Sequence, residues 1–177
     1  MDVPNVIGDW QEYQSAQWSG LRVRVHSLAK NEPRRGRSHE AKGLTYARFH
    51  VTFENRGNRS RNIKLTTHPY HYDARVGPDG HAAFIDTTAS ETIRDYTLYP
   101  QRRVTATLYI AATTARLKQL DIQISPDIDD DSAFGYIWTG GLGIHEASTR
   151  PTRRPSTATP SLAGEIENYL KTNPPTP

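Results

Sequence analysis

The feature that most constrains this chain is a two-residue alternation of apolar and polar side chains along its middle. In residues 47–54 every odd position is apolar and every even position is polar, and residues 21–26 repeat the pattern. Segments 104–110 and 120–124 alternate in the same way, with their apolar residues at even positions. Successive side chains of a β-strand point to opposite faces, so this pattern predicts strands with one buried face. Helical periodicity is missing from the region.

Turn residues separate the alternating segments. Asn55-Arg56-Gly57-Asn58 follows one predicted strand, and Gly77-Pro78-Asp79-Gly80 lies between two shorter ones at 70–76 and 81–85. Further strands are expected near 63–65, 96–99 and 134–138. Seven to eight short antiparallel strands separated by such turns are typical of a sandwich. We therefore predict an all-β, immunoglobulin-like β-sandwich, since a doubly wound α/β fold would need amphipathic helices between its strands.

The flanks of the chain differ from its middle. We expect residues 1–19 to form an aromatic segment, 20–147 the sandwich, 148–160 a flexible Pro/Ser/Thr-rich linker, and 161–177 a short helix and tail. The expected helix places four apolar side chains on one face, where they would dock on the chain's own domain, on a second copy or on a partner: Leu162, Ile166, Tyr169 and Leu170. The aromatic residues Trp10, Tyr13 and Trp18 are expected to seal one end of the sandwich rather than to form an exposed patch.

Composition limits the chemistry. The chain has no cysteine, so no disulfide or thiolate metal site can form, and packing alone must stabilise the fold. No apolar run approaches the roughly 20 residues of a membrane helix, and residues 1–10 lack the features of an export signal. These observations predict a cytoplasmic protein as the chain stands, or an extracellular one if Met1 replaces a removed signal peptide.

Arginine dominates the basic residues, and several of its clusters fall in predicted loops. The guanidinium group suits carboxylate and phosphate, so loops 34–37, 56–61 and 102–103 would make an anion-binding surface if, as the expected topology allows, they share one end of the sandwich. Ordinary solvated loop charge is the simpler explanation. The candidate binding residues are Arg34, Arg35, Arg37, Arg56, Arg59, Arg61, Arg102 and Arg103.

Two patterns resemble metal sites, but each is incomplete. His68, His71 and His81 flank the predicted hairpin, yet the odd spacing of the first two would direct them to opposite faces of a strand. Asp127, Asp129 and Asp131 match the opening of a calcium loop, whose later glycine and glutamate are absent here. No nucleophile, phosphate-binding loop or dinucleotide motif stands out. We therefore expect no metal site, no cofactor and no enzymatic activity.

Several of these elements together resemble a known family. They are the strand end Val51-Thr52-Phe53-Glu54-Asn55, the strand Ile63-Lys64-Leu65, the hairpin turn at 77–80, and Leu98-Tyr99-Pro100 before the strand 104–110. The chain is similar over about residues 20–140 to a bacterial family of immunoglobulin-like sandwiches of unknown function, common in actinobacteria and often secreted or lipid-anchored. This chain has Pro100-Gln101 where the family has Pro-Gly, and it lacks the export signal. The resemblance implies the fold and a non-enzymatic binding role, without functional residues.

Together these observations predict a protein-interaction module with an unidentified protein partner. The first alternative is binding of nucleic acid or another polyanion through the arginine loops, which predicts affinity that falls steeply with salt. The second alternative is a structural subunit of a larger assembly, which predicts defined self-association.

Overall fold

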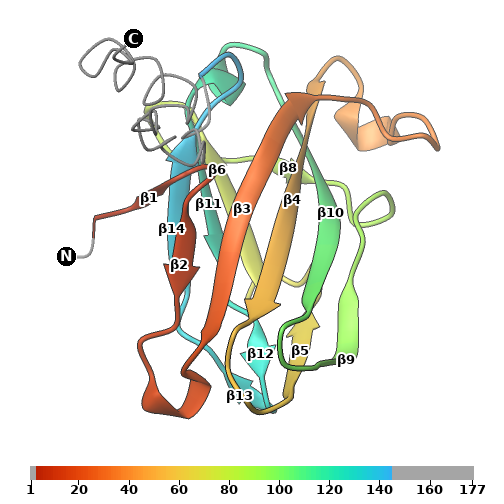
Figure 1. Cartoon of the computed structure of the whole chain (residues 1–177). Coiled ribbons are helices and arrows are strands. Elements are labelled where there is room, and N and C mark those ends of the chain that lie inside the picture. Colours follow the sequence, from red (N-terminus) through yellow and green to blue (C-terminus); the bar gives the residue numbers. More distant parts are fainter. Residues whose placement is uncertain (1–2, 145–177) are drawn as a thin grey trace, which may run out of the picture.

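The computed structural model describes residues 3–144, which form a β-sandwich (Figure 1). The sheet that carries the alternating strands, here the β4 sheet, has the order β2 (Trp10–Glu12), β3 (Leu21–Lys30), β4 (Thr45–Asn55), β10 (Arg103–Ala112) and β8 (Phe84–Ile85). The second, the β11 sheet, runs β1 (Asn5–Val6), β14 (Tyr136–Gly140), β11 (Leu120–Ile124), β6 (Tyr72–Val76) and β7 (His81–Ala82). The third, the β5 sheet, contains β13 (Asp131–Ser132), β12 (Asp127–Ile128), β5 (Arg61–Leu65) and β9 (Ile93–Leu98).

Short 3-10 helices complete the described elements: η1 (Ala16–Trp18), η2 (His39–Ala41) and η3 (Arg116–Lys118). Between residues 3 and 144, no helix is long and apolar enough to cross a membrane. The predicted linker at 148–160 and the predicted helix with Leu162, Ile166, Tyr169 and Leu170 lie outside the described residues.

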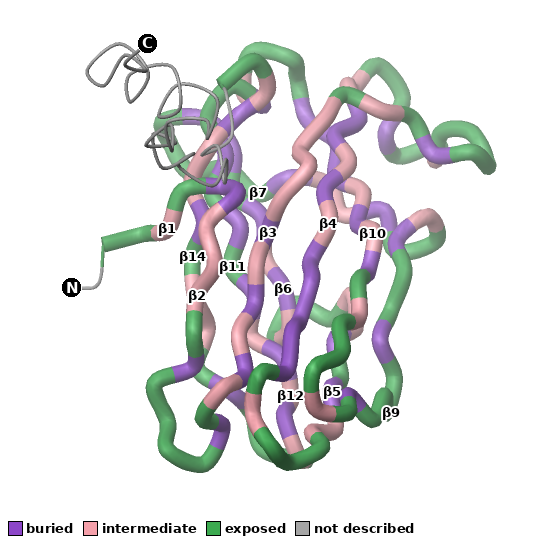
Figure 2. The backbone as a smooth tube through the Cα atoms, viewed as in Figure 1, coloured by how far each residue is buried: buried purple, intermediate pink, exposed green. Residues whose placement is uncertain are grey.

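The alternating pattern sets the core, as expected. The alternating apolar side chains at odd positions of residues 21–25 on β3 and 47–53 on β4 are fully buried in the core, and on β3 they alternate with more exposed residues (Figure 2). Phe49 of β4 meets Tyr72 of β6 edge to face at 6.1 Å between ring centroids, which joins the β4 and β11 sheets through the core. The immunoglobulin-like all-β sandwich predicted from the sequence is confirmed, and its long strands are those with the clearest alternation.

Two expectations about the strands need correction. The segment 81–85 is not one strand: β7 pairs with β6 across the predicted hairpin turn, whereas β8 pairs with β10 in the β4 sheet. The N-terminal segment is also part of the sandwich rather than a separate unit. Asn5 pairs with Trp138 in a parallel arrangement, and Trp10 pairs with Arg24 in the β4 sheet, so this segment connects both layers.

The turn after β9 places a non-glycine residue, Gln101, in the left-handed region. Gln101 has φ 61°, the left-handed conformation that glycine adopts without steric cost. The backbone N–H of Arg102 donates to the Tyr99 carbonyl at 3.2 Å, closing a turn over Pro100 and Gln101. The Gln101 side chain also donates to the Arg56 carbonyl at 3.1 Å, so this contact ties the turn to the β4–β5 loop.

Candidate functional site

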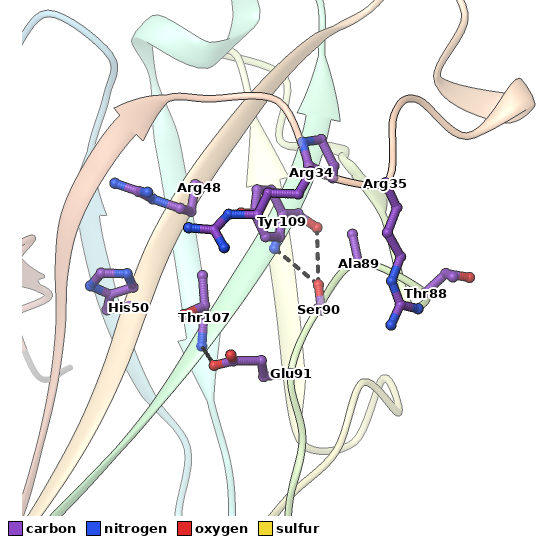
Figure 3. A pocket seen from close by; sticks show the side chains of 11 residues that line it. Arg34, Arg35, Arg48, His50, Thr88, Ala89, Ser90, Glu91, Thr107 and Tyr109 are labelled. Atoms are coloured by element: carbon purple, nitrogen blue, oxygen red, sulfur yellow. Dashed lines mark hydrogen bonds between the residues drawn. The ribbon is translucent and has the colours of Figure 1, made fainter.

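The candidate functional site is a pocket of about 520 Å³ on the outer, polar face of the β4 sheet (Figure 3). We call it the arginine pocket. It is formed by the β3–β4 loop, by β4 and β10, and by the loop that follows β8. Its lining consists of Pro33, Arg34, Arg35, Arg48, His50, Thr88, Ala89, Ser90, Glu91, Thr107 and Tyr109.

Strand register places the floor of this pocket. Arg48 and His50 lie on the polar face of β4, and they stand opposite Tyr109 and Thr107 of β10 in the antiparallel ladder. Arg34 enters from the β3–β4 loop and extends over the sheet toward Arg48 and Thr107 (Figure 3). Arg35, from the same loop, extends instead toward Thr88 (Figure 3). The pocket thus contains two of the predicted binding residues, Arg34 and Arg35, together with Arg48 from the sheet itself.

The wall opposite the β3–β4 loop is held by hydrogen bonds. The Tyr109 amide donates to Ser90 Oγ at 2.9 Å, and the Thr107 amide donates to Glu91 Oε2 at 2.7 Å. Beneath this wall, the buried Asp86 carboxylate accepts from the amide of Ala89 at 2.9 Å and from the Tyr46 hydroxyl at 2.7 Å. These bonds fix the loop after β8 against the sheet and so give the pocket a defined shape.

The charges of the pocket are unbalanced. Within residues 3–144, the side chains of Arg34, Arg35 and Arg48 form no ion pair or hydrogen bond, and Nε of Arg48 is buried without a partner. Glu91 is the one carboxylate in the lining, and its Oε2 already accepts from the backbone. A guanidinium group presents a planar set of donors that matches a carboxylate or phosphate. The pocket therefore offers free donors to an anion.

The other predicted arginines lie elsewhere, and the expectation that all three loops share an end is wrong. β3 and β4 are antiparallel, so the loop 34–37 lies at the opposite end of the sandwich from the turn 56–61 (Figure 1). The turn 56–61 does lie beside residues 101–103, because the Gln101 amide donates to the Asn55 carbonyl at 2.7 Å. Arg37 pairs with Glu32 rather than lining the pocket, and Arg102 is exposed at the far end.

At that far end, acidic side chains neutralise much of the positive charge. Glu54, which is buried, pairs with Arg22, with Arg103 at 2.7 Å and with Arg56 at 3.4 Å. The Trp10 ring lies beneath the guanidinium groups of Arg22 and Arg103, and the Arg22 group is 4.0 Å from the ring centroid. This cluster is part of the sheet surface, and Trp10 does not seal the sandwich as expected.

A second polar hollow of about 800 Å³ at this end brings together Arg56, Arg59 and Arg61. Arg61 donates to Asp129 at 2.9 Å, and Asp129 also accepts from the Asn62 amide at 2.8 Å. The predicted cluster is therefore real in space, but its most buried arginine already has a counter-ion.

The histidine and aspartate patterns meet at one pair, His71 and Asp127, and their other members have different partners. His71 contacts Asp127 at 3.1 Å, and its Nδ1 accepts from the Thr66 amide at 3.1 Å. His68 stacks on Tyr70 in an exposed loop, and His81 is exposed on β7. Asp131 accepts from Gln17 at 3.1 Å, whereas Asp129 is bonded to Arg61. In the part of the chain that the structure describes, no three such side chains come together as a metal site.

His26, beside the arginine pocket, should make stability depend on pH. Burial, with the nearby charge of Arg24 and the proximity of His50, lowers the pKa of His26 to about 4. The folded state binds this proton less readily than the unfolded state. The unfolding free energy is therefore unaffected by His26 above a pH of about 6.5 and decreases as the pH falls toward 4. The half-buried position reduces the effect to about 1–2 kcal/mol.

The measurement is urea denaturation between pH 7.5 and pH 4. His26→Gln, which can still contact Thr52, should remove most of the decline in unfolding free energy between pH 6.5 and pH 4. His81→Gln, an exposed histidine on β7, is the matched control. An unchanged slope in His26→Gln would contradict the assignment.

Comparisons with known proteins bear on this chain through structure alone. No protein-family model matches the sequence, and no curated protein matches it. Among solved structures, ycdA of Bacillus subtilis is similar over 68% of this chain at 12% identity with a TM-score of 0.48, and this chain covers 36% of ycdA. The secreted protein MPT63 of Mycobacterium tuberculosis matches 78% of this chain at 13% identity, with 97% of its own length covered and a TM-score of 0.48.

An uncharacterized β-sandwich protein of Clostridium difficile matches 78% of this chain at 12% identity, with 94% of its own length covered and a TM-score of 0.44. At these identities and TM-scores the likenesses concern the β-sandwich fold alone. They carry no information about a ligand.

Proposed function

We propose that this domain is a non-enzymatic protein-interaction module whose arginine pocket binds an acidic segment of a partner protein. The observation that carries the proposal is that Arg34 extends toward Arg48 in one pocket, with Arg35 on its opposite side, and that none of the three has an acidic partner among the described residues (Figure 3). Each guanidinium group can form a two-point contact with a carboxylate, and such charge-assisted bonds are stronger than neutral ones. The pocket is on a rigid sheet face, so little ordering would be needed on binding.

A binding role is supported over serine-based catalysis by the state of the one serine hydroxyl in the pocket lining. Ser90 Oγ accepts from the Tyr109 amide at 2.9 Å and lies 3.4 Å from the Tyr109 carbonyl. It is therefore engaged with the backbone rather than with a general base, which a serine nucleophile would require.

An acidic protein segment is favoured over nucleic acid by the distribution of charge. Glu54 and Asp129 pair with arginines at the far end, so the described surface supports a local pocket rather than a continuous basic track. Binding of a nucleic acid strand needs such a track, together with exposed aromatic rings for base stacking. Nucleic acid binding and assembly into a larger particle are the alternatives that the experiment must separate.

The test is fluorescence anisotropy with two labelled probes, a hexaglutamate peptide and a single-stranded oligothymidine of 20 nucleotides. Arg34→Glu and Arg48→Glu should each weaken peptide binding at least about tenfold, because each removes a charged hydrogen-bond donor worth about 1.5–3 kcal/mol. Arg102→Glu, an exposed reversal at the far end, is the control with the same change in net charge.

Three outcomes would overturn the proposal. The first is an equal loss of peptide affinity in Arg102→Glu, and the second is absence of peptide binding by the unaltered chain. The third is tighter binding of the oligonucleotide with a steep salt dependence, which would move polyanion binding to first place. Light scattering on the same samples would detect defined self-association and so test the structural-subunit alternative.

Membership in the actinobacterial family named above belongs to the same proposal. So does the compartment, which is either the cytoplasm or the cell exterior. Fractionation of cells that express the full gene distinguishes the two.

A further inference from the structure

An apolar groove of about 830 Å³ lies on the side of the sandwich, away from the arginine pocket. It runs between the N-terminal segment, η1 and the start of β14. Its lining consists of Val3, Pro4, Asn5, Gln11, Tyr13, Gln14, Ser15, Trp18, Phe134, Gly135, Tyr136 and Ile137. None of these side chains is charged, so the groove suits a neutral occupant.

Four aromatic rings line this groove in sequence. Trp18 meets Tyr13 at 5.9 Å, Tyr13 meets Tyr136 at 5.4 Å, and Tyr136 meets Phe134 at 5.7 Å between ring centroids. Tyr13 and Trp18 are buried, so they belong to the core as predicted, but Phe134 is 69% exposed and Val3 is 89% exposed. Apolar rings in contact with water at the rim of a groove indicate a surface that another segment covers.

Two buried polar atoms in the lining lack partners. The hydroxyl of Tyr13 and the indole N–H of Trp18 have no hydrogen-bond partner among the described residues. An unsatisfied buried donor costs about 1–3 kcal/mol, so a small movement of either side chain that lets it donate to an acceptor of an occupant would stabilise the complex. Backbone carbonyls of an extended peptide are such acceptors, and Pro-containing peptides dock in grooves lined by Tyr and Trp.

We propose that the occupant is this chain's own segment 155–160, Pro-Ser-Thr-Ala-Thr-Pro. The segment has no charge, which matches the lining, and it has a proline at each end. Proline favours the extended conformation whose carbonyls point outward to donors. The charged residues Arg153 and Arg154 precede the segment and would stay in solvent.

Chain length allows this segment to return to the groove. From Ile137, in the groove, β14 and the residues after it lead away to Ile144, at most about 24 Å for seven residues. The eleven residues from Ile144 to Pro155 can span up to roughly 36–40 Å. The segment can therefore fold back along β14 and lie over the aromatic rings.

The absence of cysteine makes a direct test possible. Ser156→Cys in the full chain accepts a single nitroxide label, and its effect is read from amide and indole signals in a nitrogen-15 spectrum. We expect the Trp18 indole and Phe134 amide signals to lose more than half their intensity, whereas Ala111, on β10 at the other edge of the sandwich, keeps its signal. Equal intensities with the oxidised and the reduced label would overturn the proposal.

A mixed sample separates this chain's segment from that of a second copy. Isotope-labelled chain without nitroxide, mixed with unlabelled chain that carries it, should show full Trp18 intensity. Broadening in the mixture would overturn the proposal in favour of a second copy.

Sequence variants test the recognition itself. Pro155→Ser combined with Pro160→Ser should restore the Phe134 and Ile137 signals in the spin-labelled chain. Pro174→Ser combined with Pro175→Ser, the matched control outside the segment, should not. Tyr13→Phe, which removes only the hydroxyl, should restore part of the intensity, and Tyr99→Phe, an exposed tyrosine elsewhere, should restore none. Unchanged broadening in the first variant would contradict recognition through the prolines.

Discussion

Glu54→Ala is expected to lower the unfolding free energy by about 2–4 kcal/mol at pH 7. The Glu54 carboxylate is buried and is shared by Arg22, Arg56 and Arg103. Its removal leaves three cations close together, with Arg22 itself largely buried, and breaking a buried pair costs more than the pair contributes. The measurement is urea denaturation of the two proteins at equal ionic strength.

The pH dependence of the unfolding free energy tests whether the Glu54 charge causes this loss. Burial acts to raise the pKa of Glu54, but hydrogen bonds from Arg103 and Arg22 outweigh it, so the pKa lies below its ordinary value. Stability from this group is therefore complete above the unfolded pKa, near 4.5, and is lost as pH falls through the lower folded pKa. Glu54→Gln should thus lose stability at pH 7 and show a flatter decline below pH 4.5. A destabilisation of Glu54→Gln that is the same at pH 7 and at pH 3 would contradict the ion-pair explanation.

Asn55→Ala is expected to cost about 2–4 kcal/mol as well, although it removes only a neutral side chain. Asn55 is fully buried, and its Nδ2 donates to the Arg59 carbonyl at 2.7 Å and to the Leu98 carbonyl at 2.9 Å. Its Oδ1 accepts from the Gly57 amide at 3.0 Å. Alanine would leave these three backbone groups without partners near the core, where each unmade bond costs about 1 kcal/mol or more.

Asn58→Ala in the same turn is the matched control, because Asn58 is exposed and should change stability by less than about 0.5 kcal/mol. The measurement is urea denaturation of the two variants, whose midpoints are compared with that of the unaltered protein. A loss of less than 1 kcal/mol in Asn55→Ala would show that water satisfies the freed backbone groups.

The fold could be predicted from the sequence because each of its long strands has one solvent-facing face and one buried face. Phe49, Val51 and Phe53 are fully buried, as the alternation required. The split of residues 81–85 into β7 and β8 could not be read in this way, because a two-residue strand has no measurable period. The departure at Gln101 was visible in the sequence, but its backbone conformation depends on the turn that the Tyr99 carbonyl closes.

The candidate site was predicted only in part, and for a reason that lies in topology. Arg34 and Arg35 were identified, but they were grouped with the turn 56–61. Consecutive loops of an antiparallel meander alternate between the two ends, so this error was avoidable from the order of strands. The sequence does not single out Arg48, because a charged residue on the polar face of a strand normally contacts only water. The signal that could have found it is the repetition of charge on neighbouring outward positions: Arg22, Arg24 and His26 on β3, with Arg48, His50 and Glu54 on β4.

The parallel pairing of β1 with β14 has a consequence for synthesis of the protein. Asn5 and Trp138, which are partners in this pair, are separated by 133 positions in sequence (138 − 5). At about 5–20 residues per second, roughly 7–27 seconds pass on the ribosome between their appearance. During that interval the nascent chain can form the β3–β4 hairpin, but the first strand has no edge to join. Closure of the β11 sheet must therefore follow translation of nearly the whole domain. Chaperones that bind the nascent chain would encounter β1 before it has paired with β14.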